Sequence, residues 1–157
     1  MELWQRFSGD ARRAVLRAHE IAREMRAREI APEHLALAII DIEHGSGYEM
    51  LRRMGLNLER LREALLAVAP MGSEEPPEEI TFSAQAQRCL QTAYVEWQKR
   101  AAATLGRSDD DIPGYLHLES VHLLLGLLAP SSRCECRTLI SHGVFYGEVS
   151  ELLRRGK

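Results

Sequence analysis

The sequence predicts an all-α fold, in which a four-helix repeat occurs twice and about eight helices form one compact bundle. Three observations predict this class. Apolar residues recur at helical spacing along most of the chain, and no stretch alternates convincingly between apolar and polar residues as a half-buried strand would. The two halves of the chain are also similar to each other, which indicates an internal repeat.

The repeat is visible in two aligned blocks. The sequence "FSGDARRAVLRAHEIA" at 7–22 aligns with "FSAQAQRCLQTAYVEW" at 82–97. Further along, "EHLALAIIDIEHGSGYEMLRRMGLNLERLREALL" aligns without a gap with "VHLLLGLLAPSSRCECRTLISHGVFYGEVSELL", which places His34 opposite His122. The match predicts that both halves fold alike.

We expect residues 1–157 to form a single domain made of two repeats. Repeat one is expected at 7–68 and repeat two at 81–155. The segment 69–80 is rich in proline and glutamate and is predicted to connect the repeats. Extra residues near 104–117, rich in glycine, proline and aspartate, are predicted to form a loop inserted in repeat two.

Repeat one carries clear helix boundaries. Ser8 is placed to cap the first helix, because its hydroxyl can accept a hydrogen bond from a free first-turn amide. Pro32 suits the first position of the second helix, where its missing N–H needs no partner. Gly55 is expected to end the third helix and Asn57 to cap the fourth. The apolar stripe of the first helix comprises Ala11, Ala14, Val15, Ala18, Ile21, Ala22 and Met25.

Composition and charge argue against several classes of protein. A formal net charge of -3 gives no basic patch for nucleic acid, and the longest apolar run, "VHLLLGLLAP", is too short to cross a bilayer. The amino terminus has no apolar core of signal-peptide length. The 3 cysteines are an odd number without framework spacing, which favours a reducing compartment. We expect a soluble cytoplasmic protein that binds neither nucleic acid nor membrane.

No pattern typical of an enzyme occurs in the sequence. It lacks the nucleotide-binding GxxxxGK[ST], the zinc-protease HExxH and a nucleophile elbow, so we expect no catalysis, no cofactor and no metal. His34 and His122 each stand at the head of an apolar run, which indicates either a metal or catalytic site used twice or a structural unit built twice. A metal site needs three or four converging ligands. The structural interpretation is therefore favoured, with each ring packed and one ring nitrogen bonded to backbone.

A hypothesis of another class stays open. Cys134, Cys136 and His142, together with His122, form a nominal set of soft ligands that would suit a small metal-dependent enzyme or a thiol redox switch. The two neighbouring cysteines are separated by one residue and lack a second pair, so the pattern falls short of a zinc-binding motif. Metal analysis of the purified protein separates the two classes.

The chain carries a family resemblance. The order of Phe7 and Ser8, "ARRAVLRAHEIA", "EHL" before an apolar helix, and "LRRMGLNLERL" resembles the amino-terminal double-repeat domain of the Clp-family ATPases. These are the unfoldase subunits that feed the Clp protease and the related disaggregases. The resemblance covers about 7–153 and includes the duplication. It implies a pseudo-twofold bundle that binds adaptor proteins, substrate polypeptides or Clp ATPase subunits and performs no chemistry itself. The chain is expected to be either a stand-alone accessory protein or part of a longer ATPase.

Some bacterial members of that family recognise phosphoarginine, a degradation tag, through an acidic residue just before the histidine. The resemblance places Glu33 in that role in repeat one, with Ser8 and helix amides meeting the phosphate. Repeat two offers Ser83 but has Val121 where the carboxylate would stand, and Asp10 adds negative charge where those members have an arginine. Both departures argue against a working double site. The residues expected to bind a partner are Ser8, Glu33, His34, Ser83 and His122.

Overall fold

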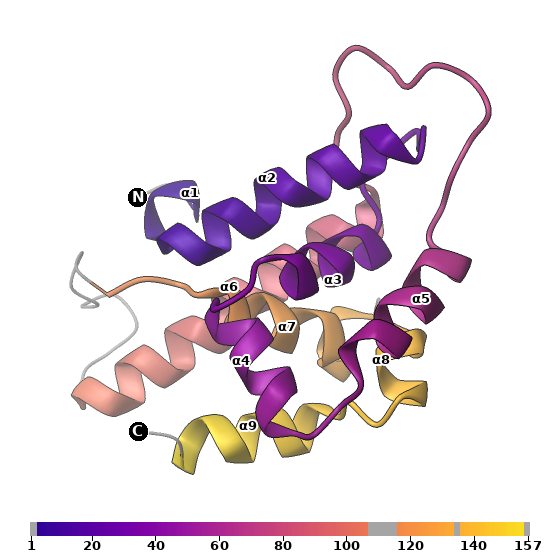
Figure 1. The fold of residues 1–157 in the computed structure, drawn as a ribbon. Helices are drawn as coiled ribbons and strands as arrows, with labels where there is room; N and C mark the ends of the chain where they lie inside the picture. Colours follow the sequence, from indigo (N-terminus) through magenta and orange to yellow (C-terminus); the bar gives the residue numbers. More distant parts are fainter. Residues whose placement is uncertain (1–2, 107–115, 134–135, 156–157) are drawn as a thin grey trace.

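The computed structural model describes residues 3–106, 116–133 and 136–155, and the regular elements within these ranges are helices (Figure 1). The first half holds α1 (Leu3–Arg6), α2 (Gly9–Glu24), α3 (Pro32–Asp41), α4 (Ser46–Arg53) and α5 (Leu58–Val68). The second half holds α6 (Ala84–Leu105), α7 (Ser120–Leu128), the 3₁₀ helix η2 (Pro130–Ser132), α8 (Arg137–Ser141) and α9 (Tyr146–Arg155). The all-α prediction is confirmed.

The two halves repeat the same order of helices. By the sequence alignment, α2 corresponds to α6, and α3, α4 and α5 correspond to α7, α8 and α9. Helix α6 continues through Leu105, where Gly106 with a φ of 64° ends it, so Thr104 and Leu105 are helical rather than part of the predicted loop. The alanine-rich end of α6 favours this extension. Residues 107–115 of that loop lie outside the described residues, and the short α1 is an element that the sequence did not predict.

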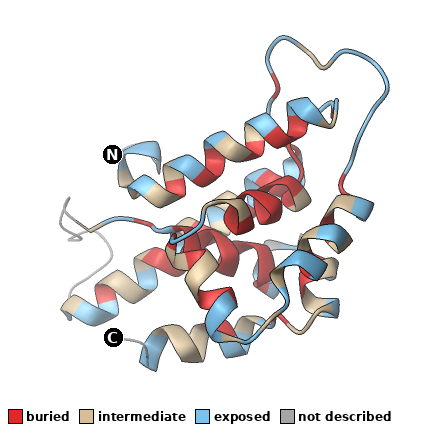
Figure 2. Cartoon of the chain, in the orientation of Figure 1, coloured by how far each residue is buried: buried red, intermediate tan, exposed pale blue. Residues whose placement is uncertain are grey.

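Helices α3 and α7 form the centre of the bundle, as Figure 2 shows. Every residue of α7 is buried, and α3 is buried at Pro32 and from His34 to Ile40. Helix α2 packs on α3 and α6 packs on α7, so each repeat contributes a helical hairpin to the core. Helices that are apolar on most sides are stable only inside a protein. No helix within the described ranges combines the length and the apolar character needed to cross a membrane.

Two backbone bridges tie the repeats together. Phe7 forms a parallel bridge with Leu118, and Phe82 forms the equivalent bridge with Ile30. In each case the residue after the phenylalanine donates its amide to the carbonyl of the bridged residue, at 2.8 Å in the first bridge and 2.9 Å in the second. Each bridge therefore joins the start of one repeat's first helix to the segment before the other repeat's second helix.

The helix boundaries predicted in repeat one are confirmed. The Ser8 hydroxyl accepts a first-turn amide of α2 at 3.2 Å, and the Asn57 side chain accepts a first-turn amide of α5 at 3.1 Å. Pro32 begins α3, and Gly55 follows α4 with a φ of 75°, which glycine adopts without strain. These local signals place the starts of the helices that meet between the repeats.

Helices α6 and α7 approach each other closely at Gly126. A β-carbon at Gly126 would lie 2.3 Å from the carbonyl oxygen of Cys89 and 3.0 Å from the β-carbon of Ala93. Only glycine fits between these two backbones. Gly147 in α9 has no such neighbour within 4 Å, so the same substitution there meets open space.

Gly126→Ala is predicted to lower the free energy of unfolding by about 1–3 kcal/mol, because the added methyl group forces α6 and α7 apart. Gly147→Ala, the same change at an open helical position, is predicted to raise it by about 0.5–1 kcal/mol, because alanine has less backbone freedom to lose on folding. Equilibrium urea unfolding followed by circular dichroism measures both. Equal unfolding midpoints for the two variants would contradict the close approach.

Candidate functional site

The first turn of α2 meets the first turns of α4 and α7 at junction one, which we define by Asp10, Ser46 and Ser120. Oδ2 of Asp10 accepts from the Ser46 amide at 2.8 Å and from the Ser120 hydroxyl at 2.8 Å, and Oδ1 accepts from the Ser120 amide at 3.2 Å. The Ser46 hydroxyl, at 3.2 Å, and the Ser8 hydroxyl also donate to this carboxylate. One side chain thus binds three helix starts, two from repeat one and one from repeat two.

The two serine hydroxyls of junction one also link α4 and α7 directly. Ser120 Oγ accepts the Gly47 amide at 2.8 Å, and Ser46 Oγ accepts the Val121 amide at 3.0 Å. Burial raises the pKa of Asp10, but hydrogen bonds from the surrounding serines outweigh it and leave the pKa below its usual range. The carboxylate is therefore charged at neutral pH, where it stabilises the positive ends of the helices. Junction one already holds its own anion.

The equivalent place in the other half, junction two, is an open cavity of about 490 Å³. Gln85 stands on α6 where Asp10 stands on α2, so a neutral amide replaces the carboxylate at this helix start. The only carboxylate among the described lining residues comes from Glu33 in the first turn of α3, and two arginines line the same cavity. The lining residues are Pro32, Glu33, Val68, Gln85, Arg133, Arg137 and Thr138.

The structure does not bring Ser8 and Glu33 together. Ser8 caps α2 at junction one, whereas Glu33 lies in the first turn of α3, which packs antiparallel to α2 (Figure 1). Helix α2, which has 16 residues and is therefore about 24 Å long, runs from the Ser8 end to the end near which α3 begins. The bridge between Ile30 and Phe82 brings the start of α6 to the segment before α3. The serine on the same side of the molecule as Glu33 is therefore Ser83, which caps α6. This corrects the expected combination, and the binding role of these residues stays a prediction.

His34 and His122 hold the starts of α3 and α7. Nδ1 of His34 accepts the Ala31 amide at 2.9 Å, and Nδ1 of His122 accepts the Glu119 amide at 2.9 Å. His34 is 0% exposed, and burial lowers its pKa although the neighbouring Pro70 carbonyl and Glu33 raise it. The interpretation of these histidines as packed side chains bonded to backbone is confirmed.

The soft-ligand hypothesis finds little support in the described residues. Cys134 lies outside them, and no group of three histidine, cysteine or acidic side chains suited to a metal occurs among them. Cys136 is a buried free thiol, and burial raises its pKa to about 11, which disfavours the reactive thiolate form. Cys89, by contrast, is disulfide-bonded, which the cysteine count did not predict.

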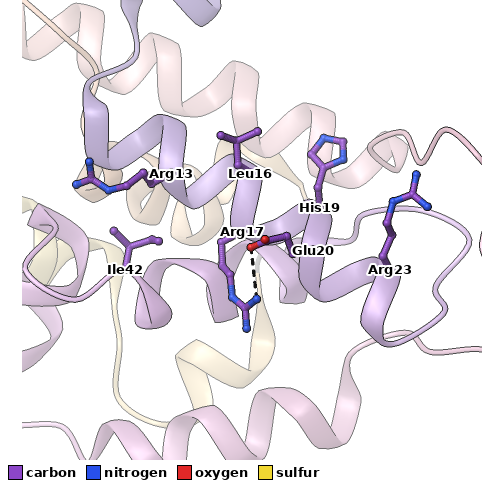
Figure 3. Close-up of a pocket in the computed structure, with 7 residues that line it drawn as sticks. All are labelled: Arg13, Leu16, Arg17, His19, Glu20, Arg23 and Ile42. Carbon is purple, nitrogen blue, oxygen red and sulfur yellow. Dashed lines mark hydrogen bonds and ion pairs between the residues drawn. The ribbon is translucent and has the colours of Figure 1, made fainter.

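A second open cavity, of about 690 Å³, lies on the outer face of α2 (Figure 3). Leu16 is 56% exposed at this face, and Arg17 is held in place by Asp41 at 3.0 Å and by Glu20 at 3.4 Å. The lining residues are Arg13, Leu16, Arg17, His19, Glu20, Arg23 and Ile42. The sequence did not predict this cavity, because one exposed leucine off the buried stripe is common on protein surfaces.

The fold and the two junctions define a class of protein, a duplicated α-helical domain in which helix starts meet between the repeats. Junction one is closed by Asp10, and junction two is open. Residues 6–107 match the family described as Clp repeat (R) N-terminal domain. The chain belongs to this family.

Relatives within the family are much longer than this chain. The chain is 29% identical over 141 residues to chaperone protein ClpC1, chloroplastic, of Oryza sativa subsp. japonica. The aligned region covers 90% of this chain and 14% of the rice protein. The chain is 30% identical over 125 residues to the uncharacterized protein Rv2667 of Mycobacterium tuberculosis. This aligned region covers 80% of the chain and 44% of that protein. The chain spans less than half the length of either relative.

Solved structures share the fold. The N-domain of ClpV from Vibrio cholerae has a TM-score of 0.73 at 18% identity, over 99% of this chain and 89% of that chain. A complex of a ClpV N-domain with a VipB peptide has a TM-score of 0.70 at 18% identity, over 98% and 89% of the two chains. The N-terminal domain of ClpD from Arabidopsis thaliana has a TM-score of 0.64 at 19% identity, over 99% and 98%.

Asp10→Asn is predicted to lower the free energy of unfolding by about 2–4 kcal/mol at neutral pH, because charge-assisted hydrogen bonds to three helix starts are lost. Folding lowers the pKa of Asp10, so the charged carboxylate stabilises the folded state. This contribution to the free energy of unfolding is complete above the pKa of an unfolded aspartate, about 4, and is lost as the pH falls through the pKa of the folded state. Urea unfolding at several pH values measures this difference. Gln85→Ala, the control at the equivalent exposed position, is expected to stay within about 0.5 kcal/mol of the parent. Equal losses for both variants would contradict the difference between the junctions.

Proposed function

We propose that this chain is a protein-interaction module that recognises adaptor proteins or substrate polypeptides for a Clp-type unfoldase or protease. It acts in protein quality control and regulated proteolysis in the cytoplasm and performs no chemistry itself. Clp ATPase subunits are the further partners of this proposal, whether the chain works alone or tethered to an ATPase. The single observation that carries the proposal is junction two, an open polar cavity at the place where the equivalent junction is closed.

Three features support polypeptide binding at junction two. The cavity lies between the repeats and is lined by both acidic and basic side chains, Glu33, Arg133 and Arg137. These side chains can bind the charged side chains and the backbone groups of a bound polypeptide. Helix starts from both repeats border it, and their free amides favour acceptor groups. The ClpV N-domain that shares this fold was solved with a VipB peptide bound to it.

Glu33 also supports a narrower candidate, the recognition of phosphoarginine. A guanidinium group takes a carboxylate in bidentate geometry, and Glu33 is the carboxylate of junction two. Arg133 and Arg137 line the same cavity and suit the phosphate. Junction one carries Val121 at the position of Glu33, and the Asp10 carboxylate repels a phosphate. We therefore propose one such site in the chain and not two.

Immobilised protein is expected to enrich Clp ATPase subunits and their substrates from a native lysate, identified by mass spectrometry. Glu33→Lys is predicted to reduce this capture at least several-fold, because it reverses the charge of the one carboxylate among the described lining residues of junction two. Glu59→Lys is the matched control, since Glu59 also lies in the first turn of a helix but is exposed away from the cavity. Equal capture by both variants would show that junction two is not the binding surface.

Titration with free phosphoarginine tests the narrower candidate. Loss of one bidentate, charge-assisted pair costs about 1.5–3 kcal/mol, so Glu33→Gln is predicted to weaken binding by about 10-fold to 100-fold. Glu59→Gln is expected to bind like the parent protein. Isothermal titration calorimetry measures the three affinities, and either absent binding or equal binding to parent and Glu33→Gln rejects the candidate.

A further inference from the structure

The outer face of α2 carries an exposed apolar side chain between two basic ones. Arg13, Leu16 and Arg23 follow one another at intervals of three and seven residues, so they lie on one side of the helix, and Figure 3 shows them in this order along it. Leu16 is 56% exposed, and the partly buried Ile42 lines the same open cavity. At about 690 Å³ this cavity is within the usual size range of ligand sites, roughly 300–1,000 Å³. We define the α2 face by these four residues.

The α2 face offers side chains to a partner and no strand edge. Helix α2 is continuous from Gly9 to Glu24, so its backbone groups beyond the end turns are hydrogen-bonded within the helix. A partner segment therefore cannot add to it as a strand and has to satisfy its own backbone hydrogen bonds. An α-helix does so, and its apolar side chains recur every three or four residues, which suits packing against an exposed leucine of another helix.

The charges of the α2 face favour an acidic partner. Arg17, which lines the same cavity, is already paired with Asp41 at 3.0 Å and with Glu20 at 3.4 Å. Within the described ranges Arg13 forms no ion pair with a carboxylate, and the Arg23 guanidinium donates to a neutral backbone carbonyl. These two guanidinium groups are ten residues apart along α2, about 15 Å, with the exposed leucine between them.

Other occupants suit these charges less well. Burial, and then the nearby Arg23, lower the pKa of His19, so its ring adds no charge to the face at neutral pH. Two arginines are too few for nucleic acid, which needs an extended row of basic residues, and the chain has a net charge of -3. A second copy of the chain would bring two basic faces together, and like charges repel.

We propose that the α2 face binds an acidic amphipathic helix of a partner polypeptide. An apolar side chain of that helix packs on Leu16 and Ile42, and two of its carboxylates pair with Arg13 and Arg23. Carboxylates three helical turns apart are separated by about 16 Å, close to the spacing of the two arginines. This inference goes beyond the proposed function, because the cavity on α2 shares no described lining residue with junction two.

The probe is a capped, alanine-rich helical peptide of about 16 residues, with two central leucines and two glutamates placed three turns apart on the same face. A second probe carries lysine in place of each glutamate. Titrated into the intact ¹⁵N-labelled protein, the glutamate probe is expected to cause saturable amide shifts at Arg13, Leu16 and Arg23. It is expected to bind at least about 5-fold more tightly than the lysine probe. Equal binding of the two probes, or no saturable shift on α2, overturns the inference.

Leu16→Glu tests the apolar contact, because Leu16 is exposed and glutamate favours a helix as leucine does. It is predicted to weaken binding of the glutamate probe at least about 10-fold, since it removes an apolar contact and adds a like charge. Val95→Glu is the matched control, since Val95 is an apolar residue of α6 that is 41% exposed and lies outside the cavity. Equal binding by the parent protein and Leu16→Glu overturns the inference.

Arg13→Glu tests the charge pairing. It is predicted to weaken binding of the glutamate probe about 5-fold and to strengthen binding of the lysine probe by a similar factor. A change in the same direction for both probes overturns the inference. Shifts at Leu16 that appear when the protein is concentrated without any probe also overturn it, because they assign the face to a second copy.

The same samples separate this inference from the proposed function. Glu33 lies outside the cavity on α2, so Glu33→Lys is expected to leave binding of both probes unchanged. A protein that captures Clp subunits but ignores the glutamate probe contradicts only the inference made here. A protein that binds this probe but captures no Clp subunit or substrate contradicts only the proposed function.

Discussion

Backbone pairing between the repeats is the constraint on which the rest of the structure depends. The bridges Phe7–Leu118 and Phe82–Ile30 hold the first helix of each repeat against the segment that enters the second helix of the other. The positive ends of helices from both repeats therefore meet at two places. Each of these places needs a compensating negative group, either from the protein or from a partner. At junction one this group is the Asp10 carboxylate of the protein itself.

Duplication has allowed the two junctions to take different roles. At junction one, Asp10 and the serines of α4 and α7 satisfy the helix starts internally, which makes this junction a structural element. At junction two the same position is Gln85, and the cavity stays open with Glu33 on its wall. The two junctions of one duplicated scaffold thus differ in charge and in openness.

The sequence predicted the features that depend on nearby residues. The fold class, the Ser8 cap, Pro32 at the start of α3 and the backbone role of the histidines follow from spacing along the sequence, and the structure confirms them. It did not predict that Glu33 belongs with Ser83, because that pairing depends on a bridge between distant segments. Nor did it predict the extension of α6 or the hydrogen bonds that Asp10 accepts from the first residues of α4 and α7. The hydrogen bonds of Asp10 depend on which helix starts converge in three dimensions.

A partner polypeptide is expected to contact junction two and to leave junction one closed. Amide chemical-shift mapping of the intact ¹⁵N-labelled protein, titrated with casein as a polypeptide without a fixed fold, distinguishes the two junctions. We expect shifts at Glu33, Gln85 and Thr138, while the amides of Ser46 and Ser120, held by Asp10, stay unchanged. Shifts at Ser46 and Ser120 without any at Glu33 would contradict it.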